Sequence, residues 1–299
     1  LPESAPDADG WTTNMWGVRR RLVGREPDRY ETVYPFGEET SLDDVEAHPW
    51  PDPSRLDFGG VRTACEAVRD RYATVGSPWS PFYHEVWWIV GQESFFIWMS
   101  TKPQVLKAII RRVVDYEIEA TRRFLQAAGG LIDITYVGND YGSQRGLAVS
   151  PAMWNEFIRH EQKRYFDVSR DHGCKAMFHS CGAVRDIVPA LIEEGVDVLD
   201  PVQVQAAGMS LAGLARDFGD RLAFHGGVDT QGTLPFRAAS EVREHVRANL
   251  DLFRGRGGYI LTGSQLYIGD IPLDNILAIY EENRRGAGLT RGRAPGRTP

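Results

Sequence analysis

Short apolar runs alternate with longer amphipathic stretches from residue 57 to residue 285, and this alternation constrains the fold more than any other feature of the sequence. Each apolar run is short and nearly continuous, which is typical of parallel strands buried on both faces. Strands and helices in alternation predict an α/β fold with a parallel sheet. The expected strands are residues 82–90, 132–137, 175–179, 196–199, 222–225 and 259–262.

The amphipathic stretches predict helices with recognisable start and stop residues. Ser150 followed by Pro151 matches an N-cap with proline at the first helical position. Glycines at 129, 173 and 195 are typical of helix ends that adopt a left-handed conformation. The expected helices are residues 57–75, 102–127, 151–171, 184–194, 238–254 and 272–285, with a shorter one near 210–217.

Six strand–helix units can be counted, and the commonest closed arrangement of such units is an eight-stranded barrel. We therefore expect a (β/α)₈ TIM barrel over residues 57–285, with two units either upstream of Leu1 or degenerate. An open doubly wound sheet is the alternative. No Gly-x-Gly-x-x-Gly sequence follows any expected strand, so a dinucleotide-binding version of that fold lacks its fingerprint.

The segments outside this alternating region have different compositions. Residues 1–56 contain two stretches with strand character, 16–23 and 30–35, on either side of a turn-prone Gly-Arg-Glu-Pro sequence. They predict a β-hairpin in an N-terminal extension that packs on the barrel. Alternating prolines over 48–53 predict an extended connector after it. The Arg- and Gly-rich residues 286–299 predict a flexible tail.

Charge and cysteine content exclude some classes of partner. The chain has 41 acidic and 34 basic residues, for a net charge of -7, so a surface that follows nucleic-acid phosphates is not expected. Its most apolar stretch, 86–99, is shorter than the roughly 20 residues that a membrane-spanning helix needs. Cys65, Cys174 and Cys181 have no framework spacing, which indicates free thiols in a reducing compartment. We expect a cytoplasmic protein without a nucleic-acid or membrane partner.

Polar residues follow the expected strands, where the active site of a barrel enzyme lies, at the carboxyl ends of the strands. The candidates are His84, Asp140, Tyr141, Gln144, His179, Cys181, Gln203, His225, Asp229 and Gln265. We expect seven of them to surround one cavity: His84, Asp140, His179, Cys181, His225, Asp229 and Gln265.

The most informative of these sequences is His179-Ser180-Cys181. Residues two apart on a strand point to the same side, so an imidazole and a thiolate can reach one ion together, and this pair suits zinc. Gly182 allows the backbone to turn tightly after them. The alternative is a packed histidine beside a buried structural thiol.

Asp140, Asp229 and His225 are also open to two interpretations. A carboxylate at a strand end needs a cation, a substrate group or backbone donors when it is buried, so either aspartate could be a third metal ligand or a general acid or base. Either could instead cap the following loop. His225 precedes two glycines that would let a ligand approach the backbone, and the alternative is a histidine of the core.

A series of motifs occurs in order along the chain: Asn139-Asp140-Tyr141-Gly142-Ser143-Gln144, Ser150-Pro151, Phe178-His179-Ser180-Cys181-Gly182, residues 191–197, Asp200-Pro201-Val202-Gln203, residues 224–229 and residues 272–276. Together they resemble the uroporphyrinogen decarboxylase superfamily, and more narrowly its branch of corrinoid-dependent methyltransferases. The resemblance spans about residues 10–285. It implies a (β/α)₈ barrel whose first helix and strand lie upstream of Leu1.

The resemblance also implies a zinc site. In the methyltransferases a His-x-Cys sequence and a further cysteine near the last strand hold zinc, and by position the first two ligands are His179 and Cys181. The third position falls at Ser264-Gln265, where this sequence has no cysteine. Three arrangements remain, in order of preference. Asp140 or Asp229 completes the site, or His179 acts as an acid or base without metal, or Cys181 acts as a thiolate.

The resemblance makes a methyltransferase the leading expectation. It would move a methyl group, with zinc, between a thiol or a small substrate such as a methoxylated aromatic and a corrinoid on a partner protein. Asp140, His179 and Asp229 would be catalytic, and the remaining candidates would bind substrate. The alternative is a metal-free decarboxylase or lyase for a small aromatic or pyrrolic acid, using Asp140, His179 and Arg145. A third possibility is that the chain is a binding or scaffold subunit without enzymatic activity.

We expect a homodimer, as in the family, because the Trp- and Phe-rich segment 82–99 is very aromatic.

Overall fold

The computed structural model of the chain describes residues 4–24, 29–78, 81–255 and 258–286. The chain divides into two compact units, each built around its own contacts. Unit 1 comprises Leu1–Asn139 and Ser150–Ala176, and unit 2 comprises Asp140–Val149 and Met177–Pro299. The expected boundary at residue 56 stays a prediction. The expected tail lies, beyond residue 286, outside the described residues.

Five parallel strands form one sheet, and they follow one another in it in chain order, β4-β5-β6-β7-β8. A helix follows each strand, which is the repeating βα pattern of a TIM-barrel-like α/β fold. Five of the six expected strands are thus confirmed to within a few residues, and the described residues contain no eight-stranded closure. The strands are β4 (Ile134–Gly138), β5 (Lys175–His179), β6 (Val198–Val202), β7 (Ala223–Val228) and β8 (Tyr259–Gly263).

The expected strand at 82–90 is wrong, because this segment is helix α3 (Phe82–Val90). Six of its nine residues are buried, and only His84 and Glu85 interrupt a run of aromatic and aliphatic side chains. A short continuous apolar run of this kind does not distinguish a buried strand from a buried helix. Gly91, at φ +85°, separates α3 from α4 (Gln92–Thr101).

The expected helix over 57–75 is also much shorter in the structure. Helix α2 covers only Val61–Glu66, and Val75 instead forms a parallel bridge with Ile134 at the start of β4. Asp133 fixes this extended segment, since its carboxylate accepts a 2.7 Å hydrogen bond from the backbone N–H of Thr74. The strand-like part of the first βα unit therefore lies near residue 75.

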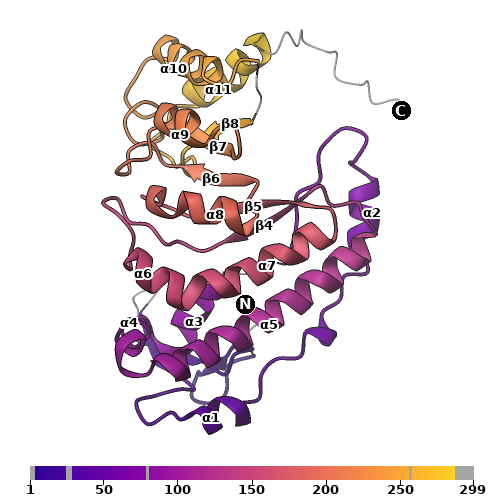
Figure 1. Ribbon diagram of the computed structural model, residues 1–299, viewed down its shortest axis with the longest axis vertical. Helices are drawn as coiled ribbons and strands as arrows, with labels where there is room; N and C mark the ends of the chain where they lie inside the picture. The colour runs from indigo at the N-terminus through magenta and orange to yellow at the C-terminus, as the bar shows by residue number, and fades with distance from the viewer. Residues whose placement is uncertain (1–3, 25–28, 79–80, 256–257, 287–299) are drawn as a thin grey trace. The chain divides into compact units, whose positions relative to one another are not determined.

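The longest helix of unit 1 is α5 (Pro103–Ala128), which packs against α3 and α7 (His160–Asp171). Figure 1 shows α5 and α7 side by side. Helix α6 (Pro151–Trp154) begins as expected, with Ser150 Oγ accepting from the N–H of Met153, and a π-helical segment, Asn155–Arg159, joins it to α7.

Unit 2 carries the helices that follow β5 to β8. Helices α10 and α11 pack on each other and, with β7, enclose a core that includes Val228, Val242, Val246 and Ile279. These four side chains are buried, which anchors the carboxyl end of β7. The helices are η3 (Arg185–Ile187), α8 (Val188–Glu194), α9 (Leu211–Phe218), α10 (Ala239–Asp251) and α11 (Leu273–Gly286).

The N-terminal part of unit 1 is a three-stranded antiparallel sheet, in the order β1-β2-β3, followed by α1 (Leu42–Ala47) and η1 (Pro53–Arg55). Strand β2 pairs antiparallel with β3, and both strands lie within the stretches expected to form a hairpin. None of the described helices is both long enough and apolar enough to cross a membrane. The strands are β1 (Thr12–Thr13), β2 (Arg19–Leu22) and β3 (Tyr30–Val33).

Candidate metal centre

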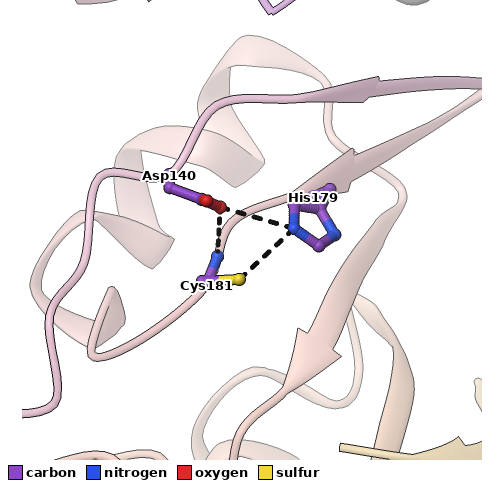
Figure 2. Close-up of side chains that lie close together, drawn as sticks. All are labelled: Asp140, His179 and Cys181. Atoms are coloured by element: carbon purple, nitrogen blue, oxygen red, sulfur yellow. Dashed lines mark hydrogen bonds and ion pairs between the residues drawn. The ribbon is translucent and has the colours of Figure 1, made fainter. Parts of the chain in front are cut away.

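Three side chains that can ligate a metal meet at the carboxyl end of β5 in unit 2. Each offers one ligand atom, and the three atoms lie within 4.8 Å of one another. His179 Nε2 is 3.4 Å from Asp140 Oδ1 and 3.5 Å from Cys181 Sγ. Figure 2 shows Asp140, which follows β4, turned toward His179 and Cys181. The structure thus brings together the His-x-Cys pair and one of the two aspartates considered as a third ligand.

Two of the spacings within the cluster fit a tetrahedral zinc site. Bonds of about 2.0 Å to nitrogen or oxygen and about 2.3 Å to sulfur place tetrahedral ligand atoms roughly 3.3 Å apart for two nitrogen or oxygen ligands and roughly 3.5 Å apart when one ligand is sulfur. The distances from His179 Nε2 to the carboxylate oxygen and to the sulfur, 3.4 Å and 3.5 Å, agree with these values. An imidazole, a thiolate and a carboxylate are also ligand types that zinc accepts. Three protein ligands leave a fourth position for substrate, which is the arrangement of catalytic zinc sites.

A buried carboxylate on the neighbouring strand orients the histidine. His179 lies opposite Asp200 of β6, and its Nδ1 is 2.8 Å from Asp200 Oδ2. The other oxygen of Asp200 is hydrogen-bonded to Nδ1 of His225, on β7. Asp200 therefore leaves Nε2 of His179 directed at the ligand cluster, as second-sphere carboxylates do for metal-binding histidines.

The charge around His179 is suited to a cation. Burial disfavours the imidazolium, but hydrogen bonds with Asp140, Asp200 and Cys181 outweigh burial and raise the pKa of His179 to about 11. The side chain of Asp200 is only 7% exposed and that of His179 20%, so water screens these interactions weakly. The same negative surroundings that hold a proton here would favour a metal ion.

Two glycines let the loop after β4 cross the loop after β5. Gly182 has φ +80°, and a Cβ on it would lie 2.5 Å from the carbonyl carbon of Gly142. A Cβ on Gly142 would lie 2.6 Å from the carbonyl oxygen of Cys181. The crossing also places the N–H of Cys181 2.8 Å from Asp140 Oδ1. The tight turn expected at Gly182 is therefore present, and it brings the aspartate to the thiol.

Two expected substrate-binding glutamines contact the same loop. Gln265, at the position where a further cysteine is implied, donates from Nε2 to Cys181 Sγ at 3.3 Å. Gln203 is buried, and its Oε1 accepts a 2.7 Å hydrogen bond from the N–H of Gly182. Gln203 thus supports the backbone, whereas Gln265 touches a candidate ligand directly.

The residues after Asp140 have different surroundings. Tyr141 is fully buried, and its ring stacks on Phe178 with the centroids 5.7 Å apart. Gln144 and Arg145 are exposed, and the backbone carbonyl of Gln144 accepts a hydrogen bond from the N–H of Ala207. The ring of Tyr141 packs in the core of unit 2, so its role in substrate binding stays a prediction.

The surroundings of Asp229 are those of a loop cap. Its carboxylate accepts hydrogen bonds from the N–H groups of Gln231, Gly232 and Thr233, and from Gln205 Nε2 at 2.8 Å. Burial opposes its ionisation, but the hydrogen bonds, those from the backbone first, lower the pKa of Asp229 below its usual range. The metal-ligand cluster contains Asp140 and not Asp229. A catalytic role for Asp229 stays a prediction.

His84 lies on α3 in unit 1. Its ring packs among aromatic side chains, with its centroid 5.1 Å from that of Trp87 and 5.9 Å from that of Tyr83. Its expected place at a strand end was wrong, because the segment that carries it is a helix.

Asp200 is a site residue that the sequence did not predict, because a lone aspartate before a proline has no ligand spacing of its own. The available signal was a charged residue at the end of an otherwise apolar strand, next in the sheet to the strand that carries His179.

Comparison with known proteins gives a family and a fold. The family described as uroporphyrinogen decarboxylase (URO-D) matches residues 29–285. No curated protein sequence matches the chain. Among solved structures, a methyltransferase from Methanosarcina mazei resembles it with a TM-score of 0.63 and 17% sequence identity, over 88% of this chain and 74% of that one. At this identity the likeness concerns the fold.

Proposed function

The chain belongs to the uroporphyrinogen decarboxylase family, and from that premise we propose that it is a zinc-assisted methyltransferase. The observation that carries the proposal is the ligand cluster of Asp140, His179 and Cys181, with its spacing and its supporting Asp200. The Methanosarcina protein of similar fold, a methyltransferase, supports the choice of reaction.

Asp140, His179 and Cys181 would hold the zinc ion, which when bound would act as a Lewis acid on a thiol or a methoxy oxygen of the substrate. Asp200 keeps His179 Nε2 aimed at the cluster through its hydrogen bond to Nδ1. Gln265, beside Cys181 Sγ, is placed to contact a substrate at the open position. Asp200 and Gln265 would thus contribute by positioning groups before the substrate binds.

The substrate in this proposal is a small thiol or methoxylated aromatic, and the other methyl carrier is a corrinoid on a separate partner protein.

We further propose that the chain is a homodimer. Trp88 and Ile97, on α3 and α4, are each about half exposed, and a contact between subunits would cover them. Sedimentation at micromolar concentration should give a dimer, and a single 33.5 kDa species would contradict this.

The test compares wild type with Cys181→Ser and with Cys174→Ser as the matched control. Cys174 Sγ donates to the carbonyl oxygen of Ile132, an interaction that serine can keep. We expect about one zinc per chain in wild type and in the control, with most of it lost in Cys181→Ser. Thiol-dependent demethylation of methylcobalamin should fall in parallel, while the circular dichroism spectrum stays unchanged.

Two results would overturn the proposal. Zinc content and methyl transfer that are undiminished in Cys181→Ser would exclude the cysteine as a ligand. Release of CO₂ from a pyrrolic or aromatic acid by the zinc-free protein, dependent on His179 and Asp140, would instead establish the metal-free lyase.

A further inference from the structure

Unit 1 contains a cavity of about 680 Å³, within the size range of small-molecule sites. Its wall comes from parts of the chain that are distant in sequence. Met15 and Trp16, residues of the proline-rich segment 49–56, Pro78, and side chains of α3 and α5 line it. None of these residues belongs to the metal-ligand cluster.

Two carboxylates lie in the wall of this cavity, one on each helix. Glu85 of α3 is 3% exposed and Glu117 of α5 is 4% exposed. Glu85 accepts a hydrogen bond from the indole N–H of Trp16. Within the part of the chain that the structure describes, Oε2 of Glu117 is buried without a hydrogen-bond partner. A buried carboxylate oxygen left in this way is costly unless a ligand satisfies it.

The ionisation of both groups is opposed by their surroundings. Burial, partly offset by the hydrogen bond from Trp16, raises the pKa of Glu85 to about 7. Burial and then repulsion from Glu85 raise the pKa of Glu117 well above its usual range. A bound cation would offset both effects and allow the carboxylates to ionise.

The rest of the wall is aromatic and apolar. Trp16 packs edge-on against Trp50 and Tyr116, with ring centroids 6.2 Å and 5.1 Å away. Indole and phenol rings attract organic cations through their faces. Among the described lining residues, Arg55 is the one further cation and Asp52 the one further anion, so acidic groups outnumber basic ones in this part of the wall. A calcium ion would require six or more oxygen ligands, and the largely apolar wall does not supply that many.

We propose that this cavity binds a small organic ammonium ion, with its charge paired to Glu85 and Glu117 and its apolar groups against Trp16, Trp50 and Tyr116. The carboxylates would select for charge, and the rings would select for methyl or other apolar substituents on the nitrogen. This site is independent of the methyl-transfer proposal and shares no residue with it.

The test titrates the full chain with choline and benzyltrimethylammonium, two probes of different size, followed by calorimetry and tryptophan fluorescence. The comparison compound is the neutral alcohol in which a tert-butyl group replaces the trimethylammonium group of choline. We expect at least one of the two cations to bind, and binding at least about tenfold more tightly than the neutral alcohol. Glu117→Gln should weaken it about tenfold or more.

Glu119→Gln is the matched control, because Glu119 lies on the same helix but pairs with Arg122 and Arg123 at the surface. It should bind the cation as wild type does. If Glu117→Gln does not fold, Trp50→Leu replaces it and should also lose affinity. Absence of binding by both cations, equal binding of the neutral alcohol, or undiminished binding in the folded variant would overturn the proposal.

Discussion

The two sites of this chain differ in how their buried polar groups are partnered. At the strand ends of unit 2, both ring nitrogens of His179 have protein partners, and each oxygen of Asp200 meets a histidine. In the cavity of unit 1, Glu117 is buried to a similar degree as Asp200, yet one of its oxygens has no hydrogen-bond partner among the described residues. In the two proposals, the first site is therefore arranged before its ion binds, whereas the second would be completed by its ligand.

This contrast has a physical basis. A metal site gains from ligands that neighbouring groups already hold in place, because little order is lost when the ion binds. An organic cation in an aromatic cavity gains from the opposite condition, since an unsatisfied carboxylate is relieved by binding. The following experiments perturb one region at a time.

The largest effect is expected where the loops of the metal centre cross. Gly182→Ala should lower the free energy of unfolding by about 4 kcal/mol, because it combines a left-handed backbone with a close contact to Gly142. Gly255→Ala is the control, since Gly255 has φ +81° but nothing within 4 Å of the added Cβ. Urea unfolding of both variants measures the difference. Equal losses of stability would contradict the role of the loop crossing.

A smaller effect, of about 3 kcal/mol, is expected for the pH dependence of stability in unit 1. The pKa of Glu85 is about 7 in the folded chain against 4.5 in an ordinary environment, so the folded state binds the proton more tightly. The contribution of Glu85 is therefore full below pH 4.5 and is lost as the pH rises through 7. Glu85→Gln should remove this loss, so the variant gains stability relative to wild type between pH 5 and pH 8. The free energies of unfolding of wild type and Glu85→Gln are measured with urea at pH 5 and at pH 8. If their difference is the same at both pH values, Glu85 is not buried as described.

The smallest effect concerns the residue that orients the metal ligand. Asp200→Asn should weaken zinc binding by about 10- to 100-fold while leaving all three ligands present. Competition with a chelating dye of known affinity measures the change. Asp251→Asn, at a surface ion pair with Arg254, should have no effect. An Asp200→Asn variant with wild-type affinity would mean that the histidine needs no orientation from β6.

The contrast also explains what could be predicted from the sequence. Strand β5 was expected with its observed bounds, and the place of His179 and Cys181 at its end follows from local spacing alone. The position of Asp140 beside His179 and Cys181 depends on the loop crossing at Gly142 and Gly182, and no local sequence pattern specifies that crossing. Asp200 required knowledge of which strand lies next to β5 in the sheet.

The cavity of unit 1 could not be predicted in this way. Its carboxylates lie on two helices, and the helix that carries Glu85 was expected to be a strand, because a short, nearly continuous apolar run does not distinguish a buried helix from a buried strand. Trp16 and Trp50 come from the N-terminal segment 1–56, which has little hydrophobic periodicity from which its structure could be predicted. A site assembled from an irregular segment and two helices depends on tertiary packing, which spacing along the chain does not record.

The most direct test of the central claim is the spectrum of the protein loaded with Co²⁺ in place of zinc. A site made by Asp140, His179 and Cys181 should give the intense visible absorption of tetrahedral cobalt and a near-ultraviolet thiolate charge-transfer band. That band should disappear in Cys181→Ser and persist in Cys174→Ser. A weak spectrum typical of six-coordinate cobalt, identical in wild type and Cys181→Ser, would contradict the metal centre.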